Sequence, residues 1–274
     1  MLAPWVAAGL AAAAAALFVE ARFIEPERLR FSRVDVPLAG LDRAFDGFRI
    51  VQLSDVHGKV TIGKAALSDA VAAQKPDAVV VTGDLIDAGG PFDPAFTMLS
   101  RLRAPAGVFF VPGNNESKAV RVGRTEGLLP RIQAAGAVPL VNRAVRIERG
   151  GGWFWLVGVD DPTWRRRDNL PWALRGTDDG RPRVLLAHAP HILRRLDGHR
   201  VDYLMTGHTH GGQVCVPWYG PLLTRSSFGR KVASGPAFVN GVRVYVSRGI
   251  GTSLLPLRFF CPPELVVHVL RRAG

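Results

Sequence analysis

Cysteine and acidic residues are both scarce in this sequence. The first shortage limits the structural class of the protein, and the second limits the charge of the partners that it favours. Its 274 residues include two cysteines, Cys215 and Cys261, which excludes a disulfide framework. With 23 acidic against 35 basic residues, the net charge is +12. This excess favours anionic partners such as phosphate esters, nucleic acid or anionic lipid head groups. An arginine-rich coding bias would produce the same excess, so charge alone does not choose a partner.

Charge is missing altogether from one stretch, Leu2–Val19. As a helix it would span about 27 Å, close to the hydrocarbon thickness of a bilayer. A secretory signal peptide is the alternative, with a cleavage site at Val19-Glu20-Ala21. However, no Lys or Arg precedes the apolar run, and the nearby positive charges all follow it. We therefore favour a membrane anchor over residues 1–21, with the following domain on the cytoplasmic side. The charges that follow are Arg22, Arg28, Arg30 and Arg33.

Low-complexity linkers and internal repeats are absent after residue 45, which predicts one catalytic domain over residues 46–274. Residues 22–45 are expected to form a connector, because Pro26 and Pro37 limit regular structure. The 47% hydrophobic content is sufficient for a sizeable core.

Short apolar runs alternate with helix-like stretches through the domain, which predicts an α/β fold with largely parallel strands and helices outside. Two further alternating segments, Val242–Ser247 and Leu265–Leu270, are expected in a second sheet packed on the first. The expected helices are Ile62–Gln74, Pro91–Leu102 and Leu128–Ala135. The expected buried strands are Phe48–Leu53, Ala78–Thr82, Val108–Val111, Phe154–Val159, Val184–Ala187 and Tyr203–Thr206.

Metal-ligand side chains follow five of these strands, at the carboxyl ends where function gathers in open α/β sheets. Imidazole, carboxylate and carboxamide groups suit divalent metals. A single histidine such as His188 would normally be a satisfied core residue, but five such coincidences in order favour a metal site. The candidates are Asp55, His57, Asp84, Asn114, His188, His208 and His210.

The order Asp55-Val56-His57, Gly83-Asp84, Gly113-Asn114-Asn115-Glu116, His188 and Gly207-His208-Thr209-His210 resembles the calcineurin-like metallophosphoesterases. The tail 247–253 with Pro262-Pro263-Glu264 is similar to a bacterial branch whose members often carry an N-terminal membrane segment.

This resemblance implies a four-layer αββα sandwich with a two-metal site. It assigns Asp55, His57 and His210 to one metal, and Asn114, His188 and His208 to the other. Asp84 would bridge the two ions and contribute to catalysis. Mn²⁺, Fe and Zn²⁺ all fit such a mixed nitrogen and oxygen ligand set.

Asn115 departs from the family pattern, in which many members have a histidine that assists the leaving group. An amide cannot donate a proton at neutral pH, so general-acid help of about 10²–10⁴-fold is missing at this position. Three interpretations remain. The substrate has a good leaving group, which we favour; another residue replaces the histidine; or the chain binds metal and barely hydrolyses.

Trp164-Arg165-Arg166-Arg167 is either a solvated loop or an anion clamp for substrate, or it contacts a charged lipid surface. Arg225, Arg230 and Lys231 invite the same interpretations. His191 and His199 are expected at the surface, and His268 is expected to be structural.

We therefore predict a membrane-anchored, two-metal phosphoesterase for an amphiphilic phosphodiester or pyrophosphate. The branch resemblance implies enzymes that cleave UDP-2,3-diacylglucosamine in lipid A biosynthesis. A nuclease or cyclic-nucleotide phosphodiesterase is the hydrolytic alternative, although no aromatic and basic platform for nucleic acid is evident. A non-catalytic, metal-dependent interaction module is the alternative from another class.

Overall fold

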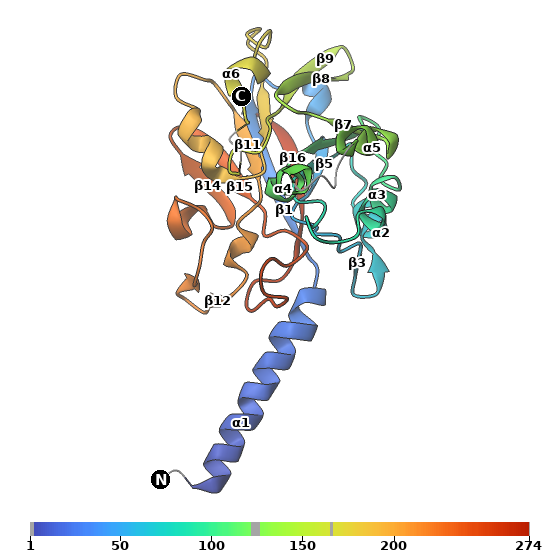
Figure 1. Ribbon diagram of the computed structural model, residues 1–274. Helices are drawn as coiled ribbons and strands as arrows, with labels where there is room; N and C mark the ends of the chain where they lie inside the picture. Colours follow the sequence, from blue (N-terminus) through green and yellow to red (C-terminus); the bar gives the residue numbers. More distant parts are fainter. Residues whose placement is uncertain (1–2, 122–126, 165–166, 274) are drawn as a thin grey trace.

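Two mixed six-stranded sheets pack face to face in the computed structural model, which describes residues 3–121, 127–164 and 167–273 (Figure 1). The first sheet, in spatial order, contains β1 (Arg30–Ala39), β16 (Glu264–Ala273), β2 (Arg49–Leu53), β5 (Ala78–Thr82), β6 (Val108–Val111) and β7 (Ala137–Pro139). The second contains β14 (Gly235–Val239), β15 (Val242–Val246), β11 (Tyr203–Thr206), β10 (Arg183–Leu186), β9 (Gly152–Gly158) and β8 (Arg143–Arg149).

Helices cover the outer face of each sheet. The α-helices of the domain are α2 (Leu67–Ala72), α3 (Asp93–Leu99), α4 (Asn114–Arg121), α5 (Leu128–Ala134) and α6 (Leu170–Ala173). The 3₁₀ turns are Arg43–Phe45, Pro190–Arg195, His210–Gly212 and Gly229–Val232. Two short two-stranded hairpins also occur among the described residues, formed by β3 (Thr61–Ile62) with β4 (Ala65–Ala66) and by β12 (Cys215–Val216) with β13 (Gly220–Pro221).

Strand β5 shows how the layers form, because successive side chains point to opposite faces of a sheet. Val79 and Val81 join the core beneath α2 and α3. Ala78 and Val80 join the core between the two sheets. Residues of β10 and β11 likewise pack outward against Leu170 of α6. This burial on both faces explains the continuous apolar strand sequences, and the predicted four-layer αββα sandwich is confirmed.

Two expectations about strands are wrong: the sheet to which Leu265–Leu270 belongs, and the lack of regular structure in the connector 22–45. Leu265–Leu270 lies in the first sheet, as part of β16, whereas Val242–Val246 lies in the second. The cause is β1, which pairs with β16 in parallel along its whole length. The predicted connector 22–45 therefore contains a regular strand. Pro37 is tolerated because β1 lies at the sheet edge, where a missing amide donor costs little.

The helix expected at Ile62–Gln74 begins later, at Leu67. Gly63 and Lys64 both have positive φ angles and form the turn between β3 and β4. Helix α4 was not expected, since its sequence overlaps the proposed ligand motif at Asn114.

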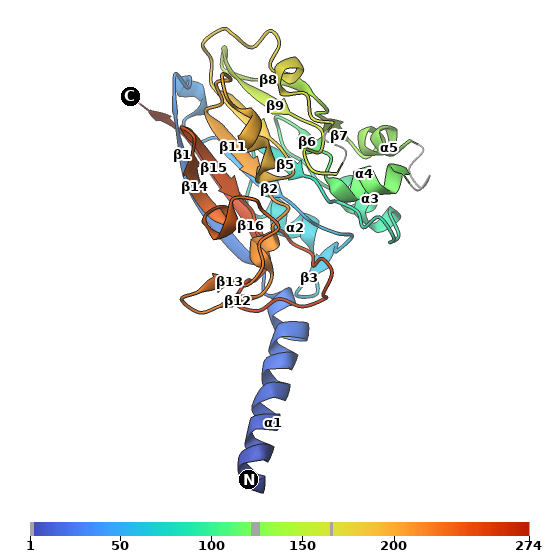
Figure 2. The ribbon, with the colours of Figure 1, turned by 60° about the vertical axis from the view of Figure 1, so that its left-hand side comes forward.

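An apolar helix projects from the domain and exposes nearly all its side chains (Figures 1 and 2). Helix α1 (Pro4–Val19) continues through a π-helical turn (Glu20–Ile24) and a 3₁₀ turn (Glu25–Glu27), with mean hydropathy 1.6. Its length and composition suit a membrane anchor or a signal sequence. Its base is bonded to the domain, since Arg258 N donates to Ala21 O at 2.9 Å and Phe260 N donates to Glu25 Oε2 at 2.8 Å.

A polar bridge joins the two sheets through His268, which is fully buried on β16, in line with the structural role expected for it. Its Nδ1 lies 2.9 Å from the hydroxyl of Tyr203 on β11, and its Nε2 lies 2.9 Å from Gln52 Oε1 on β2. Gln52 Oε1 is an acceptor, so the ring donates through Nε2 and accepts at Nδ1. Burial lowers the pKa of His268 to about 3, so the ring stays neutral in the folded protein.

We predict that His268→Leu lowers the free energy of unfolding by about 2–4 kcal/mol near pH 7.5, because two buried polar partners lose their hydrogen bonds. The folded pKa lies below the unfolded value of about 6.5. The stability that neutral His268 contributes therefore decreases as pH falls from about 6.5 toward about 3. The difference in unfolding free energy between native protein and variant should shrink over the same range. Urea unfolding at several pH values measures both effects. Tyr203→Phe, which breaks one bond of the bridge, should cost less, and an equal cost would contradict this account.

Candidate metal centre

The seven predicted ligands meet between the carboxyl ends of strands from both sheets. Their loops follow β2, β5 and β6 of the first sheet, and β10 and β11 of the second. All have buried or largely buried side chains: Asp55, His57, Asp84, Asn114, His188, His208 and His210. The structure therefore brings the side chains that follow these five strands to one place.

One group of ligands contains Asp55, His57 and His210. One possible ligand atom from each residue lies within 4.8 Å of the other two. The Nε2 atoms of His57 and His210 are 3.2 Å apart. Asp55 Oδ1 lies 3.4 Å from His210 Nε2. These three residues are those that the resemblance assigns to one metal.

The second group surrounds His188. Its Nε2 lies 3.1 Å from Asn114 Oδ1 and 3.1 Å from His208 Nδ1. Asp84 lies between the groups, with Oδ1 3.5 Å from His188 Nε2 and Oδ2 3.6 Å from His57 Nε2. Asp84 therefore faces ligand atoms of both groups.

Hydrogen bonds behind the ligands fix their orientation. The Nδ1 of His188 donates to Thr82 O at 3.0 Å, which leaves Nε2 facing the cluster. Asp55 Oδ2 accepts from Ser54 Oγ at 2.6 Å and from His208 N at 2.9 Å. Such outer partners set the tautomer and direction of metal ligands.

Glu116, quoted in the motif but given no role from sequence, holds two ligand loops together. Its Oε2 accepts from the backbone N–H groups of Asp84 at 2.9 Å and Gly113 at 2.7 Å, and its Oε1 accepts from Ile86 N at 3.1 Å. Burial and the nearby charge of Asp84 raise the pKa of Glu116 to about 7.

The ligand backbone is unusual, because five of the seven residues have positive φ: 50° for Asp55, 49° for His57, 49° for Asp84, 72° for His208 and 51° for His210. Non-glycine residues rarely adopt this region, and such strain gathers at functional sites. Gly207 is required by close approach, since a Cβ there would overlap Ser54 Oγ and Asp55 Oδ2.

The electrostatics of the cluster favour added positive charge. Burial lowers the pKa of His188, yet the carboxylates of Asp84 and Asp55 outweigh it and raise the value to about 9. Burial and the neighbouring imidazoles hold the pKa of His208 and His210 well below the usual range. These two rings therefore remain neutral, which is the form that binds metal.

The donor set fits divalent metal. Within the described residues Asp55 Oδ1 is buried and makes no hydrogen bond. Two imidazole Nε2 atoms face each other at 3.2 Å, and only one hydrogen can lie between them. A buried carboxylate oxygen left without a partner, such as Asp55 Oδ1, is costly unless a cation satisfies it. The chain thus carries candidate His and Asp metal sites typical of dinuclear metallophosphoesterases.

Asn115 is directed at the carboxylate of Asp84. Its side-chain amide donates to Asp84 Oδ2 at 2.6 Å, and its backbone N–H donates to Asp84 Oδ1 at 2.7 Å. The side chain therefore orients Asp84, a role that the sequence comparison with histidine did not suggest.

Arg258 is the most important residue that the sequence reasoning missed. It is fully buried and donates to carbonyls of the loop that crosses Asp55, among them Gly251 O at 2.6 Å and Cys261 O at 2.9 Å. Gly251 N in turn donates to Asp55 O at 2.7 Å. No sequence signal separates this arginine from the surface arginines.

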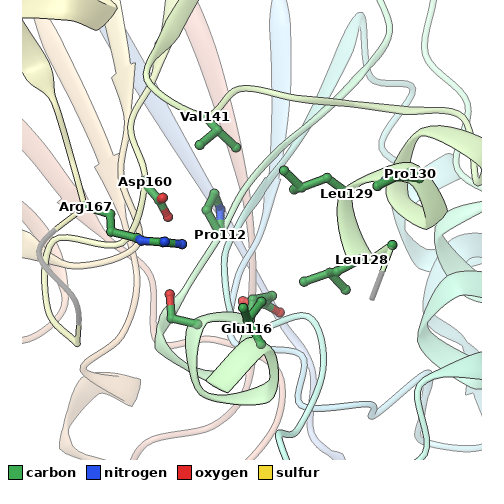
Figure 3. Close-up of a pocket in the computed structure, with 11 residues that line it drawn as sticks. Pro112, Glu116, Leu128, Leu129, Pro130, Val141, Asp160 and Arg167 are labelled. Carbon is green, nitrogen blue, oxygen red and sulfur yellow. The ribbon is translucent and has the colours of Figure 1, made fainter. Parts of the chain in front are cut away.

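Two cavities flank the ligands. The cavity that contains Glu116, of about 340 Å³, is mostly apolar, and Arg167 projects into it beside Asp160 (Figure 3). Of the predicted anion-binding residues, Arg167 therefore lies near the site, whereas Arg165 and Arg166 are outside the described residues. The other cavity, also of about 340 Å³, reaches His210 and contains Arg225.

The remaining histidines differ in position. His191 is half-buried, with its ring centroid 5.8 Å from that of His208, so it lies beside the cluster rather than at the expected surface. His199 is half-buried, in the loop before β11.

Comparisons with known proteins agree with this geometry. Residues 48–212 match the sequence profile of the calcineurin-like phosphoesterase family. The uncharacterized metallophosphoesterase YkuE of Bacillus subtilis is 28% identical over 259 residues, covering 92% of this chain and 88% of that protein. The phosphodiesterase YaeI of Escherichia coli is 33% identical over 226 residues, covering 80% and 81%. A transmembrane protein with metallophosphoesterase domain from Danio rerio is 30% identical over 256 residues, covering 88% of this chain, which spans 57% of its length.

Replacing Asp84 with Ala should lower bound metal at both positions and abolish metal-dependent hydrolysis, because its two oxygens face both ligand groups. Elemental analysis after purification with Mn²⁺ measures the loss. Asp93→Ala, which removes an exposed carboxylate on α3, is the matched control and should retain native metal content.

The same measurement separates the two groups. His210→Ala should mainly deplete one ion and His188→Ala the other. Unchanged metal content in both variants would refute this division.

Proposed function

We propose that this chain, which belongs to the calcineurin-like phosphoesterase family, holds two divalent metal ions and hydrolyses a phosphodiester or pyrophosphate bond of an amphiphilic substrate. That the chain is a metal-dependent phosphoesterase follows from the family match, the similarity to YaeI and the His and Asp cluster. The enzyme prediction is therefore confirmed, and the interaction module without catalysis is set aside.

The position of Asp84 carries the two-metal proposal, because one of its oxygens lies near His188 and the other near His57. In the proposed assignment Asp55, His57 and His210 hold one ion, and Asn114, His188 and His208 hold the other. Two divalent ions would polarise the phosphoryl group and acidify water near neutral pH. Mn²⁺, Fe and Zn²⁺ all remain candidates.

The chain's own residues position the substrate and the ligands. Asn115 orients Asp84, and Glu116 fixes the loops that follow β5 and β6. Arg225 and Arg167 lie in the two flanking cavities and supply charge for an anionic phosphoester.

A phosphodiester is supported by the name of the relative YaeI and by Asn115, which supplies no acid for a poor leaving group. A nucleotide-linked lipid such as UDP-2,3-diacylglucosamine fits this chemistry and the apolar helix, and remains one candidate within the class. Cyclic nucleotides and nucleic acid are the alternatives that a substrate panel distinguishes.

Leaving-group dependence tests the catalytic role of Asn115. Turnover should rise steeply as the leaving group becomes more acidic, so p-nitrophenyl diesters should react well and alkyl monoesters poorly. Asn115→His should accelerate the poor leaving groups by up to about 10²-fold and nucleotide pyrophosphates little, since general acid catalysis acts where charge builds on the departing oxygen. Rates across a metal-supplemented panel measure this.

Asn115→Ala is the control, because it removes the side-chain hydrogen bond to Asp84, keeps the backbone one and adds no acid. If Asn115→His accelerates every substrate equally, or none, the missing-acid explanation is wrong and orientation of Asp84 is the main role.

We also propose that the N-terminal helix anchors the enzyme, with the domain on the cytoplasmic side. Cleavage after Ala21 would split the helix base that is bonded to Arg258 and Phe260. Deleting residues 1–19 should therefore leave an active domain that partitions less to membranes, as centrifugation of cell fractions measures. Mature protein that begins near Arg22 would instead establish a cleaved signal and export.

A further inference from the structure

Large apolar side chains are exposed at the end of the domain from which α1 emerges. Trp218 and Tyr219 form the tip of the β12–β13 hairpin, and Leu222 and Leu223 follow it. Leu254 and Leu255 belong to the loop before β16. Trp218 is fully exposed, while Leu223 and Leu254 are 79% and 86% exposed. We call these six residues the apolar base surface; such patches on soluble proteins mark interaction sites.

The backbone presents two of these residues outward. Trp218 and Leu254 have φ angles of 63° and 65°, a region that bulky side chains rarely adopt. Strained positions of this kind persist where the surrounding structure enforces them. Here the strain places apolar side chains in contact with solvent, which folding alone would not favour.

Hydrogen bonds join the apolar base surface to the helix. Cys215 N, in the hairpin, donates to Phe259 O at 2.8 Å. The neighbouring Arg258 N donates to Ala21 O at the helix base. Figures 1 and 2 show β12 and the loop before β16 beside the top of α1 from both directions. A helix inserted in a bilayer would therefore carry this surface to the bilayer face.

The metal ligands lie at the same end of the domain. Strand β1 starts at the helix base, β16 runs parallel to it, and β2 runs antiparallel to β16. The carboxyl end of β2, with its ligands, therefore points back toward α1. Lys59, two residues after His57, confirms this by pairing with Glu27 at 2.8 Å.

The composition of the apolar base surface suits the boundary between head groups and acyl chains. Trp and Tyr are enriched at this depth of a bilayer. Arginines beside the surface can pair with anionic head groups. Arg230 lies over the ring of Tyr219, 4.0 Å from its centroid. Arg225 donates to Ser253 Oγ at 3.0 Å, beside the exposed leucines.

A cavity connects this surface with the metal ligands. Leucines from both segments of the apolar base surface line it, Arg225 lies in its wall, and it reaches His210. An apolar chain along the leucines would bring an attached phosphate to Arg225 and His210.

We propose that the apolar base surface lies in the head-group region of a bilayer beside α1, and that the cavity behind it admits the apolar chain of a lipid phosphoester to the metal centre. This step rests on the proposed phosphoesterase function. It adds that the substrate is taken directly from the membrane.

The first test uses the full chain in vesicles of phospholipids with brominated acyl chains, which quench nearby tryptophan fluorescence. The difference in emission between the native protein and Trp218→Phe gives the fluorescence of Trp218. Brominated lipid should quench this fluorescence. Trp172→Phe is the matched control, because Trp172 is exposed on α6 at the opposite end of the domain. The fluorescence of Trp172, obtained in the same way, should be the same with and without bromine. If the Trp218 emission is unquenched too, the membrane contact is wrong.

The second test compares hexadecyl and methyl p-nitrophenyl phosphate, which share one leaving group and differ only in chain length. In Leu223→Ser/Leu254→Ser, the turnover ratio of hexadecyl to methyl substrate should fall about tenfold or more, because two apolar contacts with the chain are lost. Phe238→Ser, an exposed aromatic on β14, should keep the native ratio.

The outcomes separate the two proposals. If the native protein with metal hydrolyses neither diester, the proposed function fails, and the quenching experiment still decides the membrane contact. If it hydrolyses both and the double variant keeps the native ratio, the substrate route alone is overturned.

Discussion

The site depends on a buried group of lone pairs that a bound divalent cation would satisfy. Imidazole, carboxylate and amide atoms from five loops converge there, and Asp55 Oδ1 has no hydrogen bond among the described residues. The raised pKa of His188 expresses the same demand for positive charge. Strained backbone angles, the buried Arg258 and the carboxylate of Glu116 hold these atoms together despite their mutual repulsion.

The sandwich explains how such a cluster is assembled. Neither sheet contains all the ligands, so the centre exists only when the two sheets pack with their carboxyl ends adjacent. The bridge from Gln52 through His268 to Tyr203 crosses this same interface. Its polar groups have directional partners, so it favours one alignment of the sheets, which apolar packing alone specifies less strictly.

The domain is also polarised toward its N-terminal helix. The antiparallel pairing of β2 with β16 turns the ligand loops back to the helix base, and the loop before β16 joins helix, ligands and exposed apolar residues. Under our proposal that this helix anchors the enzyme, the arrangement would present the metal ligands to an amphiphilic phosphoester at the bilayer face. That proposal connects the apolar helix, the apolar base surface and the neighbouring cavity in one physical account.

The sequence by itself determined the alternation of strands and helices, the apolar helix and the seven candidate ligands, because these depend on local periodicity and on residue type at strand ends. It did not reveal that Leu265–Leu270 belongs to the first sheet, since sheet membership depends on a partner strand more than two hundred residues away. Nor did it distinguish Arg258 from other arginines, or show that Asn115 binds Asp84. Burial and pairing of those side chains arise only when distant segments pack, so tertiary structure alone decided them.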